Sequence, residues 1–292
     1  MTPLQNSLKG INAAQRQNAL KMVWLSTFPA VITLPLFAVT FAAAGVLTHT
    51  LVRRFLPPPE KLSEHHEVAG FLVGVVGVLY SVVLGFLVGA VWTNFSTAQQ
   101  TADLEAGYVA DAFNYAAELP PSQGRPVQRL IAQYALAVKG EDWSHPSIED
   151  AVATGELLAR AVRIVVTTPP SANSSSPSQV LENAAVRDSL LGSLRSIGDS
   201  RRLRIVQSSS HLPAGMLEAL VLGAIFVLTF TFFFGVRSYL KQMSMTALLA
   251  GSIGLFFGLI IEFSQPYSGG ITVSREAWSV VIAGNHMADY AR

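Results

Sequence analysis

The stretch that decides the fold is residues 68–92, which read VAGFLVGVVGVLYSVVLGFLVGAVW. It lies inside an interval of 35 residues, between Glu67 and Asp103, that contains no Lys, Arg, Asp or Glu. A helix needs about 20 apolar residues, at about 1.5 Å each, to cross a hydrocarbon core of about 30 Å. The stretch therefore predicts a transmembrane helix.

Three other segments share this property. No charged residue occurs in the 31 positions between Lys21 and Arg53 or from Gln242 to Ile261, and Glu218 alone interrupts the segment from 213 to 235. A soluble protein with four such helices in its core would have little polar surface left to cover them. Cleavage of the first segment as a signal peptide is disfavoured, because its apolar run exceeds the usual 7–15 or so residues. We place four spans, near Phe28–His49, Val68–Trp92, Pro213–Gly235 and Met243–Ile261.

The composition excludes several classes of protein. Only 13% of the 292 residues are charged, against about 25% in typical globular proteins, and 50% are hydrophobic. The absence of Cys excludes disulfide scaffolds and thiolate chemistry. A net charge of +1 argues against a nucleic-acid-binding protein. The chain is expected to be an all-α polytopic membrane protein that carries no cofactor.

Four spans place both termini on one side of the membrane, together with residues 96–211. More Lys and Arg residues flank the spans on this side than on the other, which predicts that it is cytoplasmic. The first set is Lys9, Arg16, Lys21, Arg195, Arg201, Arg202, Arg204, Arg275 and Arg292, and the second is Arg53, Arg54, Lys61, Arg237 and Lys241. The expected domains are an N-terminal segment 1–22, spans one and two in 23–95, a cytoplasmic insert 96–211, spans three and four in 212–264, and a cytoplasmic tail 265–292.

The insert is predicted to be helical. Residues 96–119 continue the helix of the second span until Pro120 and Pro121 end it. Further helices are expected over about 126–138, from 147 to about 169, and from 179 toward the third span. Residues 169–178 have the Pro and Ser content of a mobile linker, and residues 275–290 are predicted to form a short helix.

Small residues of the second span fall on one face of a helix. At about 100° per residue they occupy a stripe about 120° wide, and they are Gly70, Gly74, Gly77, Ser81, Gly85 and Gly89. Such a stripe is typical of a close helix–helix seam. It also suits the wall of a narrow conduit in an oligomer. The fourth span repeats the pattern with Gly251, Gly254, Gly258 and Glu262.

Two sets of charged residues are matched in depth. Glu218 and Glu262 lie near the cytoplasmic ends of spans three and four, where carboxylates either reach water or form a cation-attracting or proton-linked pore mouth. Glu105, or Asp103, is expected to pair with Arg202 or Arg204, because helices leaving the membrane side by side bring these charges to one height. We interpret this second pair as structural.

Nothing in the sequence indicates an enzyme. There is no Ser nucleophile elbow and no metal-hydrolase spacing. The cluster of residues 64–67, Glu-His-His-Glu, is a weak candidate for a divalent-metal site, because adjacent residues rarely supply a full coordination shell.

Four ordered motifs resemble the bestrophin-like domain family of bacteria and plants. They are the glycine-rich second span with residues 103–106 (DLEA), residues 201–204 (RRLR) before the third span, residues 245–248 (MTAL), and residues 265–269 (QPYSG) with Val273 and Ser274. The last resembles a Pro-Phe-Ser-Gly turn of that family, with Tyr in place of Phe. Together they cover about residues 65–280. The resemblance implies four spans with a helical cytoplasmic insert.

The family name also implies similarity to bestrophins, which are homopentameric anion channels whose second span lines the pore. This chain has no acidic run that resembles the bestrophin calcium clasp. We therefore expect a bacterial inner-membrane homo-oligomer, with a pentamer suggested by the resemblance, that conducts small ions passively. The alternative is a non-conducting scaffold or sensor whose insert binds a cytoplasmic partner. The bestrophin analogy favours anions whereas Glu218 and Glu262 favour cations, so the selectivity stays open.

Overall fold

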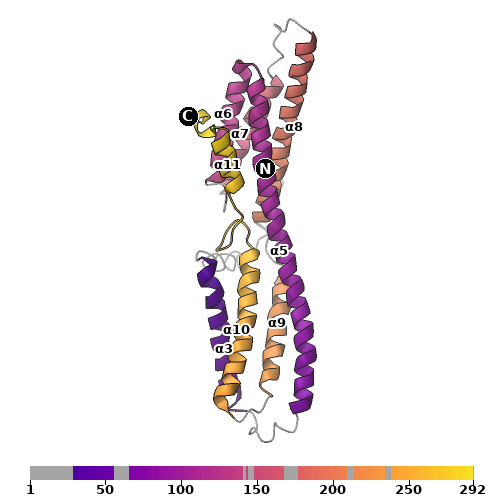
Figure 1. The fold of residues 1–292 in the computed structure, drawn as a ribbon, viewed down its shortest axis with the longest axis vertical. Coiled ribbons are helices and arrows are strands. Elements are labelled where there is room, and N and C mark those ends of the chain that lie inside the picture. Colours follow the sequence, from indigo (N-terminus) through magenta and orange to yellow (C-terminus); the bar gives the residue numbers. More distant parts are fainter. Residues whose placement is uncertain are drawn as a thin grey trace, which may run out of the picture. The chain divides into compact units, whose positions relative to one another are not determined.

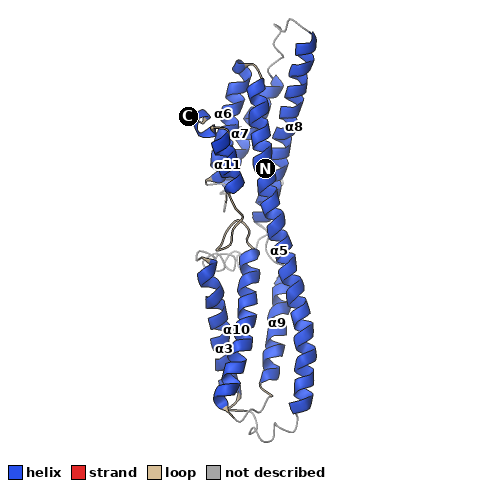
Figure 2. Cartoon of the chain, viewed as in Figure 1, coloured by secondary structure: helices blue, strands red, loops and turns tan. Residues whose placement is uncertain are grey.

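The computed structural model describes residues 29–55, 66–140, 143, 148–167, 177–208, 214–233 and 238–291. All the regular secondary structure among these residues is helical (Figure 2). The helices are α3 (Ala30–Val52), α5 (His66–Glu118), α6 (Pro121–Lys139), α7 (Ile148–Thr167), α8 (Pro177–Ser208), α9 (Ala214–Thr231), α10 (Tyr239–Phe263), α11 (Glu276–Gly284) and α12 (Met287–Tyr290). The all-α class predicted from the sequence is confirmed over these residues.

The chain divides into two compact units (Figure 1). The first unit comprises Met1–Phe95 and His211–Thr272, and the second comprises Ser96–Ser210 and Val273–Arg292. Helix α5 is 53 residues long and contributes to both units. The predicted continuation of the second span beyond residue 96 is therefore found.

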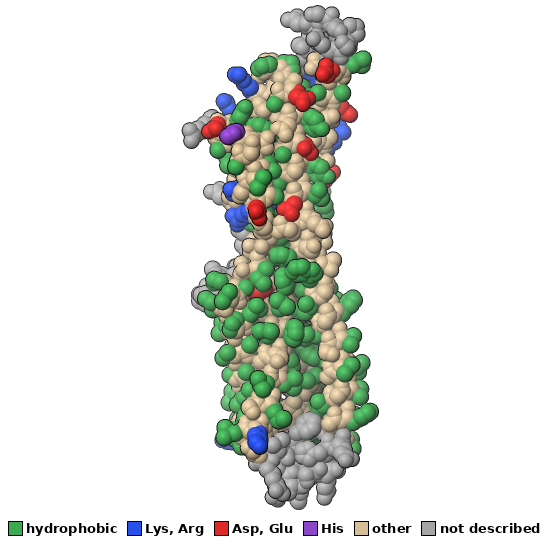
Figure 3. All heavy atoms as spheres, viewed as in Figure 1, with side chains coloured by type: hydrophobic (Ala, Val, Ile, Leu, Met, Phe, Trp, Pro, Cys, Tyr) green, Lys and Arg blue, Asp and Glu red, His purple; other side chains and the backbone are tan. Residues whose placement is uncertain are grey.

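The first unit holds the apolar helices. In the part of the chain that the structure describes, three helices are long and apolar enough to cross a membrane, and they are α3, the apolar part of α5, and α10. Helix α9 is equally apolar but has 18 residues. Hydrophobic side chains cover most of the visible surface of this unit, whereas the visible acidic and basic side chains lie mainly over the second unit (Figure 3). This distribution matches the predicted contrast between spans and insert.

Helix α3 packs along α10 in the first unit. A Cβ atom built on Gly254 would lie 2.6 Å from the carbonyl oxygen of Phe37, and one built on Gly45 would lie 2.7 Å from the Cβ of Ala250. Such distances require glycine, since the two backbones approach too closely for a side chain. The glycine face of the fourth span is therefore a seam with α3, which we call the α3–α10 seam.

Helices α5, α9 and α10 share the apolar core of the first unit. Its buried residues are Leu84, Leu87, Val91, Leu220, Ala224, Val227, Ile253, Phe257 and Ile260. The sequence predicted spans three and four as a packed hairpin. Helices α9 and α10 do share this core, but α10 makes its closer and longer contact with α3.

The second unit is a bundle built from the far half of α5 and from α6, α7, α8, α11 and α12. Its largest buried side chains include Tyr134, Trp143, Leu190, Ile197 and Trp278. Helix α6 begins at Pro121 rather than near Pro126, because proline is well accommodated in the first helical turn. A Cβ on Gly124 would clash with the carbonyl oxygen of Ala116, so glycine is needed where α5 turns into α6.

Other helix ends fall close to the predictions. Helix α7 covers Ile148–Thr167, and the predicted tail helix is divided into α11 and α12 at His286, which has a positive φ of 49°. Helix α8 begins at Pro177, so the last two residues of the predicted linker are helical. The structure does not describe residues 1–22, residues 169–176 or the side chains of residues 64–67.

Candidate functional site

The glycine stripe of α5 does not pack against the described helices of its own chain. A Cβ atom built on Gly74, Gly77, Gly85 or Gly89 would meet no atom within 4 Å. The side chain of Ser81 is exposed, and its hydroxyl donates to the carbonyl oxygen of Val78 at 2.8 Å. Among the described residues, these glycines therefore form no close helix–helix seam.

A different face of α5 makes the contacts inside the first unit. Leu84, Leu87 and Val91 are at most 7% exposed and lie in the shared core. Tyr80 covers Gly223 of α9, where an added Cβ would lie 2.6 Å from the tyrosine ring. Since these contacts fix the orientation of α5 in the unit, they also determine that the glycine stripe points away from α9 and α10.

Large apolar side chains border the stripe on the open side of α5. Val78, Val82 and Phe86, spaced four residues apart along one face, are 63%, 65% and 75% exposed. Phe86 is on the open side and Tyr80 is turned toward α9. The open face of α5 thus combines small residues with bulky apolar ones.

Glu262 is buried at the end of α10 and uses both carboxylate oxygens. The hydroxyl of Thr33 donates to Oε1 at 2.6 Å, and the backbone N–H groups of Gly270 and Ile271 donate to Oε2 at 2.9 and 3.2 Å. Gly269 has a φ of 127°, which favours glycine and directs the chain back toward the carboxylate. Glu262 therefore joins the start of α3 to the turn after α10.

The structure does not bring Glu218 and Glu262 together. The Glu218 side chain is exposed near the start of α9, and it forms no hydrogen bond or ion pair with the residues that the structure describes. Glu262 is only 4% exposed and is engaged as above. Of the two acids predicted at a pore mouth, Glu218 is the exposed one and Glu262 the buried one.

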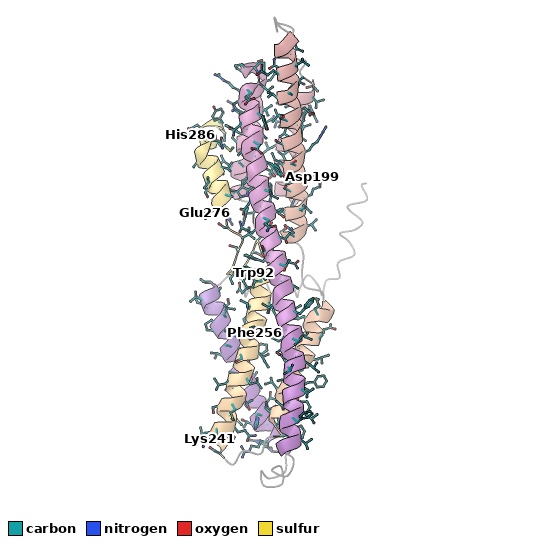
Figure 4. The ribbon with its side chains drawn as sticks, turned by 45° about the vertical axis from the view of Figure 1, so that its right-hand side comes forward. Trp92, Asp199, Lys241, Phe256, Glu276 and His286 are labelled. Carbon is teal, nitrogen blue, oxygen red and sulfur yellow. The ribbon has the colours of Figure 1, made fainter. Side chains whose placement is uncertain are left out.

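Glu105 and Arg204 form a buried ion pair in the second unit. Arg204 Nε donates to Glu105 Oε2 at 2.8 Å, and both side chains are at most 1% exposed. Arg202 is instead exposed and pairs with Asp199, whose position on α8 is labelled in Figure 4. Between the two arginines that the sequence offered as partners, the structure selects Arg204. The side chain of Asp103 accepts from Gln99 at 2.8 Å.

Tyr134 of α6 completes this buried cluster. Its hydroxyl donates to Glu105 Oε1 at 2.5 Å. Burial, and then the negative charge of Glu105, raise the pKa of Tyr134 well above its ordinary value of 10.0. A tyrosine and an arginine together satisfy one carboxylate, which is the arrangement that makes a buried charge tolerable.

Sequence reasoning missed Tyr134, Thr33 and the amides that bind Glu262. The helical spacing of α6 could have placed Tyr134 on its apolar face, but its partner lies 29 residues away on another helix. Thr33 lies 229 residues from Glu262, a pairing that no local pattern reveals. Within the described residues no three His, Asp or Glu side chains are grouped as metal ligands.

Comparison with known proteins identifies the family of this fold. Residues 39–278 match the family described as bestrophin-like domain. The chain belongs to the bestrophin-like domain family. The resemblance drawn from the four sequence motifs is thereby confirmed, and the match covers part of α3, all of α5 to α10 and the turn held by Glu262.

The bestrophin-like chain is also similar to solved structures of bacterial bestrophin homologues. A Klebsiella pneumoniae homologue with one tyrosine replaced by alanine matches with a TM-score of 0.58 at 11% identity, and one phased with zinc matches with 0.56 at 12%. A structure described as a membrane protein gives 0.59 at 11%. Each alignment covers 89% of this chain and 98% of the other. The likeness establishes a shared fold, and no curated protein sequence matches this chain.

Proposed function

We propose that this bestrophin-like membrane protein is a subunit of a homo-oligomeric channel that passes small inorganic ions without an energy source. Helix α5 lines the path, with Gly70, Gly74, Gly77, Ser81, Gly85 and Gly89 along it. The resemblance to bestrophins suggests a pentamer in a bacterial inner membrane.

The observation that carries the proposal is the open space beside the α5 glycines. Four of them have no neighbouring atom where a side chain would be, although they lie in the apolar part of the helix. Glycine in the middle of a helix costs about 0.5–1 kcal/mol relative to alanine. Several such residues on one open face therefore need a reason outside the single chain, and a narrow path between subunits supplies one.

The proposed topology has four spans. Helix α9 is about 27 Å long at about 1.5 Å per residue, close to the thickness of a hydrocarbon core. With α9 as the third span, both termini and the insert 96–211 lie in the cytoplasm, as the Lys and Arg distribution favours. The domains keep the boundaries given by the sequence, with 1–22 and 265–292 as terminal segments.

Glu218 and Glu262 differ in their proposed roles at the cytoplasmic mouth. The exposed Glu218 contributes negative charge that an ion can approach directly. Glu262 contributes charge from behind the turn that it holds. The ion pair of Glu105 with Arg204 is structural, and Arg202 is peripheral to it. Selectivity between cations and anions is a question for measurement of the reversal potential.

Ion flux in liposomes tests this function. Gly77→Leu and Gly85→Leu place bulk on the open face and are expected to reduce flux at least tenfold. The control is Gly192→Leu, because Gly192 is equally open but lies on α8 in the second unit. Unchanged flux in both α5 variants would remove α5 from the path. A monomer or dimer in detergent would remove the central path altogether.

One observation favours the alternative of a non-conducting scaffold. A groove of about 570 Å³ lies in the second unit between α5 and α11. Its lining includes Asp103, Gly107, Glu276 and Val280. Such a groove could hold a basic segment of a cytoplasmic partner. An assembly that forms a ring but shows no flux for any small ion, together with a bound partner at this groove, would favour the scaffold.

A further inference from the structure

A second apolar feature of the first unit is a groove between α3 and α9, which we call the α3–α9 groove. It has a volume of about 240 Å³. Carbon atoms make up nearly all of its lining, and the hydroxyl of Thr229 is already bonded to the carbonyl oxygen of Ile225 at 2.7 Å. The remaining lining residues are Phe41, Ala44, Gly45, Thr48, Val221, Ala224, Leu228, Phe232 and Phe257.

The groove exists because α3 and α9 are each held by a different neighbour. Gly45 brings α3 against Ala250 of α10. Gly223 brings α9 against Tyr80 of α5. Small side chains at Ala44 and Ala224 leave the space between α3 and α9 unfilled. The opening is therefore a consequence of the same close contacts that build the unit, and folding of the single chain does not close it.

The location and chemistry of the groove select a hydrocarbon occupant. Apolar cavities of this kind stay dry and take apolar guests. The volume exceeds that of an apolar cavity of about 150 Å³ that binds benzene, so a short alkyl segment fits by size. The groove lies beside α3 and α10, two of the helices able to cross a membrane. Acyl chains are the apolar molecules present there.

We call the end of the unit where α3 finishes and α10 begins the distal end, and the charged side chains described there are basic. Arg53, Arg54 and Lys241 lie there, with Arg53 stacked 5.1 Å from the centre of the Tyr239 ring. Figure 4 labels Lys241 at this end of α10. The acidic side chains described in this unit, Glu218 and Glu262, lie toward the opposite ends of α9 and α10.

Clusters of Arg and Lys beside aromatic residues are typical of the headgroup level and attract anionic lipids. The apolar groove reaches Thr48 and Phe232, in the last turns of α3 and just after α9, so it approaches the distal end. We propose that the α3–α9 groove binds one acyl chain of an anionic glycerophospholipid whose phosphate lies at the basic distal end. This inference requires membrane insertion and is independent of ion conduction.

Lipid addition to the purified full-length protein tests the proposal. Phosphatidylglycerol is expected to raise the melting temperature by about 4 °C or more, and phosphatidylcholine with the same chains is expected to raise it less. Native mass spectrometry should show retained phosphatidylglycerol. Equal effects of the two lipids would overturn the headgroup assignment, and no retained lipid would overturn the site.

Matched variants locate the site. Ala44→Phe fills the groove and is expected to abolish the shift, whereas Ala43→Phe adds the same ring to an exposed position outside the lining. Arg54→Gln should reduce the preference for phosphatidylglycerol and leave the fold intact. If Ala44→Phe keeps the full lipid effect, the groove is not the site. If it instead dissociates the oligomer without changing the lipid effect, a second copy occupies the groove and the proposal is wrong.

Discussion

The glycines of α10 and those of α5 recur at similar helical spacings but meet opposite surroundings. Gly254 on α10 lies against the backbone of α3, with no room for a Cβ atom. Gly85 on α5 faces open space over at least 4 Å. Both helices are long and apolar, and both carry their glycines on one face. A stripe of small residues on a helix indicates that another segment can approach closely. Only the packing shows whether that segment belongs to the same chain.

The two halves of α5 show the same contrast along a single helix. In the first unit its glycine face is open, whereas in the second unit Ala98, Ala102, Ala106 and Val109 are fully buried around Glu105. The filled half depends on contacts within the chain, and the open half depends on whatever surrounds it in the membrane. Substitutions can therefore separate the two halves.

The largest loss of stability is expected from breaking the buried ion pair of Glu105 and Arg204, in the second-unit half of α5. Arg204→Glu leaves two carboxylates without a cation, and breaking a buried pair typically costs about 3–5 kcal/mol. The melting temperature of the full chain in detergent should fall accordingly. The double exchange of Glu105→Arg and Arg204→Glu should recover part of the loss. A double variant no more stable than either single one would show that the pair is not coupled.

The second prediction compares the two glycine stripes directly. Gly254→Ala forces its methyl group against the Phe37 carbonyl oxygen and should cost about 1–3 kcal/mol. Gly85→Ala meets no atom and should stabilise the helix by about 0.5–1 kcal/mol. Thermal unfolding of the two variants under the same conditions measures the difference. Equal melting temperatures would mean that the α3–α10 seam is looser than described.

The third prediction concerns the end of the α3–α10 seam. Glu262→Gln places an amide NH₂ where one of the carboxylate oxygens now accepts, so the variant should lose about 1–3 kcal/mol. Glu218→Gln is the matched control, and a change within about 0.5 kcal/mol is expected because its carboxylate is exposed. Equal stability of both variants would argue that Glu262 does not hold the turn.

The smallest effect is a dependence on alkaline pH in the second unit. The pKa of Tyr134 is raised in the folded state, so at alkaline pH the tyrosine of the unfolded chain ionises first. The stability that this residue contributes below about pH 10 is therefore lost as the pH rises further. Melting temperatures measured from pH 8 to pH 11 should fall more steeply for the natural chain than for Tyr134→Phe. Parallel curves for the two proteins would remove Tyr134 as the cause.

The sequence predicts most of the fold because membrane helices follow from composition. Uncharged runs and the pair Pro120 and Pro121 place α3, α5 and α10 within a few residues. The start of α6 was placed too late, because prolines that end one helix can also begin the next. The third predicted span corresponds to α9, which has only 18 residues, so its length gives less support for a membrane-spanning helix than that of α3, α5 or α10.

The candidate site was less predictable, since it depends on partners that are distant in sequence. Helical spacing correctly grouped the glycines of α5 on one face. It could not predict that this face is open whereas the glycine face of α10 packs against α3. Matching the depth of the charges predicted that Glu105 pairs with Arg202 or Arg204. Only the packing in the structure shows that the partner is Arg204. The same matching also placed Glu218 and Glu262 at a similar depth, but their surroundings differ because Thr33 and two backbone amides reach only Glu262.

The turn after α10 has a consequence for any ion that passes nearby. Successive backbone amides, such as those of Gly270 and Ile271, form a concave cradle that commonly captures phosphate, sulfate or halide. In this chain the cradle is filled by an anion that the polypeptide carries itself, the carboxylate of Glu262. Under the proposed function, an anion at this turn must therefore compete with a tethered one of the same charge, which makes this part of the molecule a poor binding site for it.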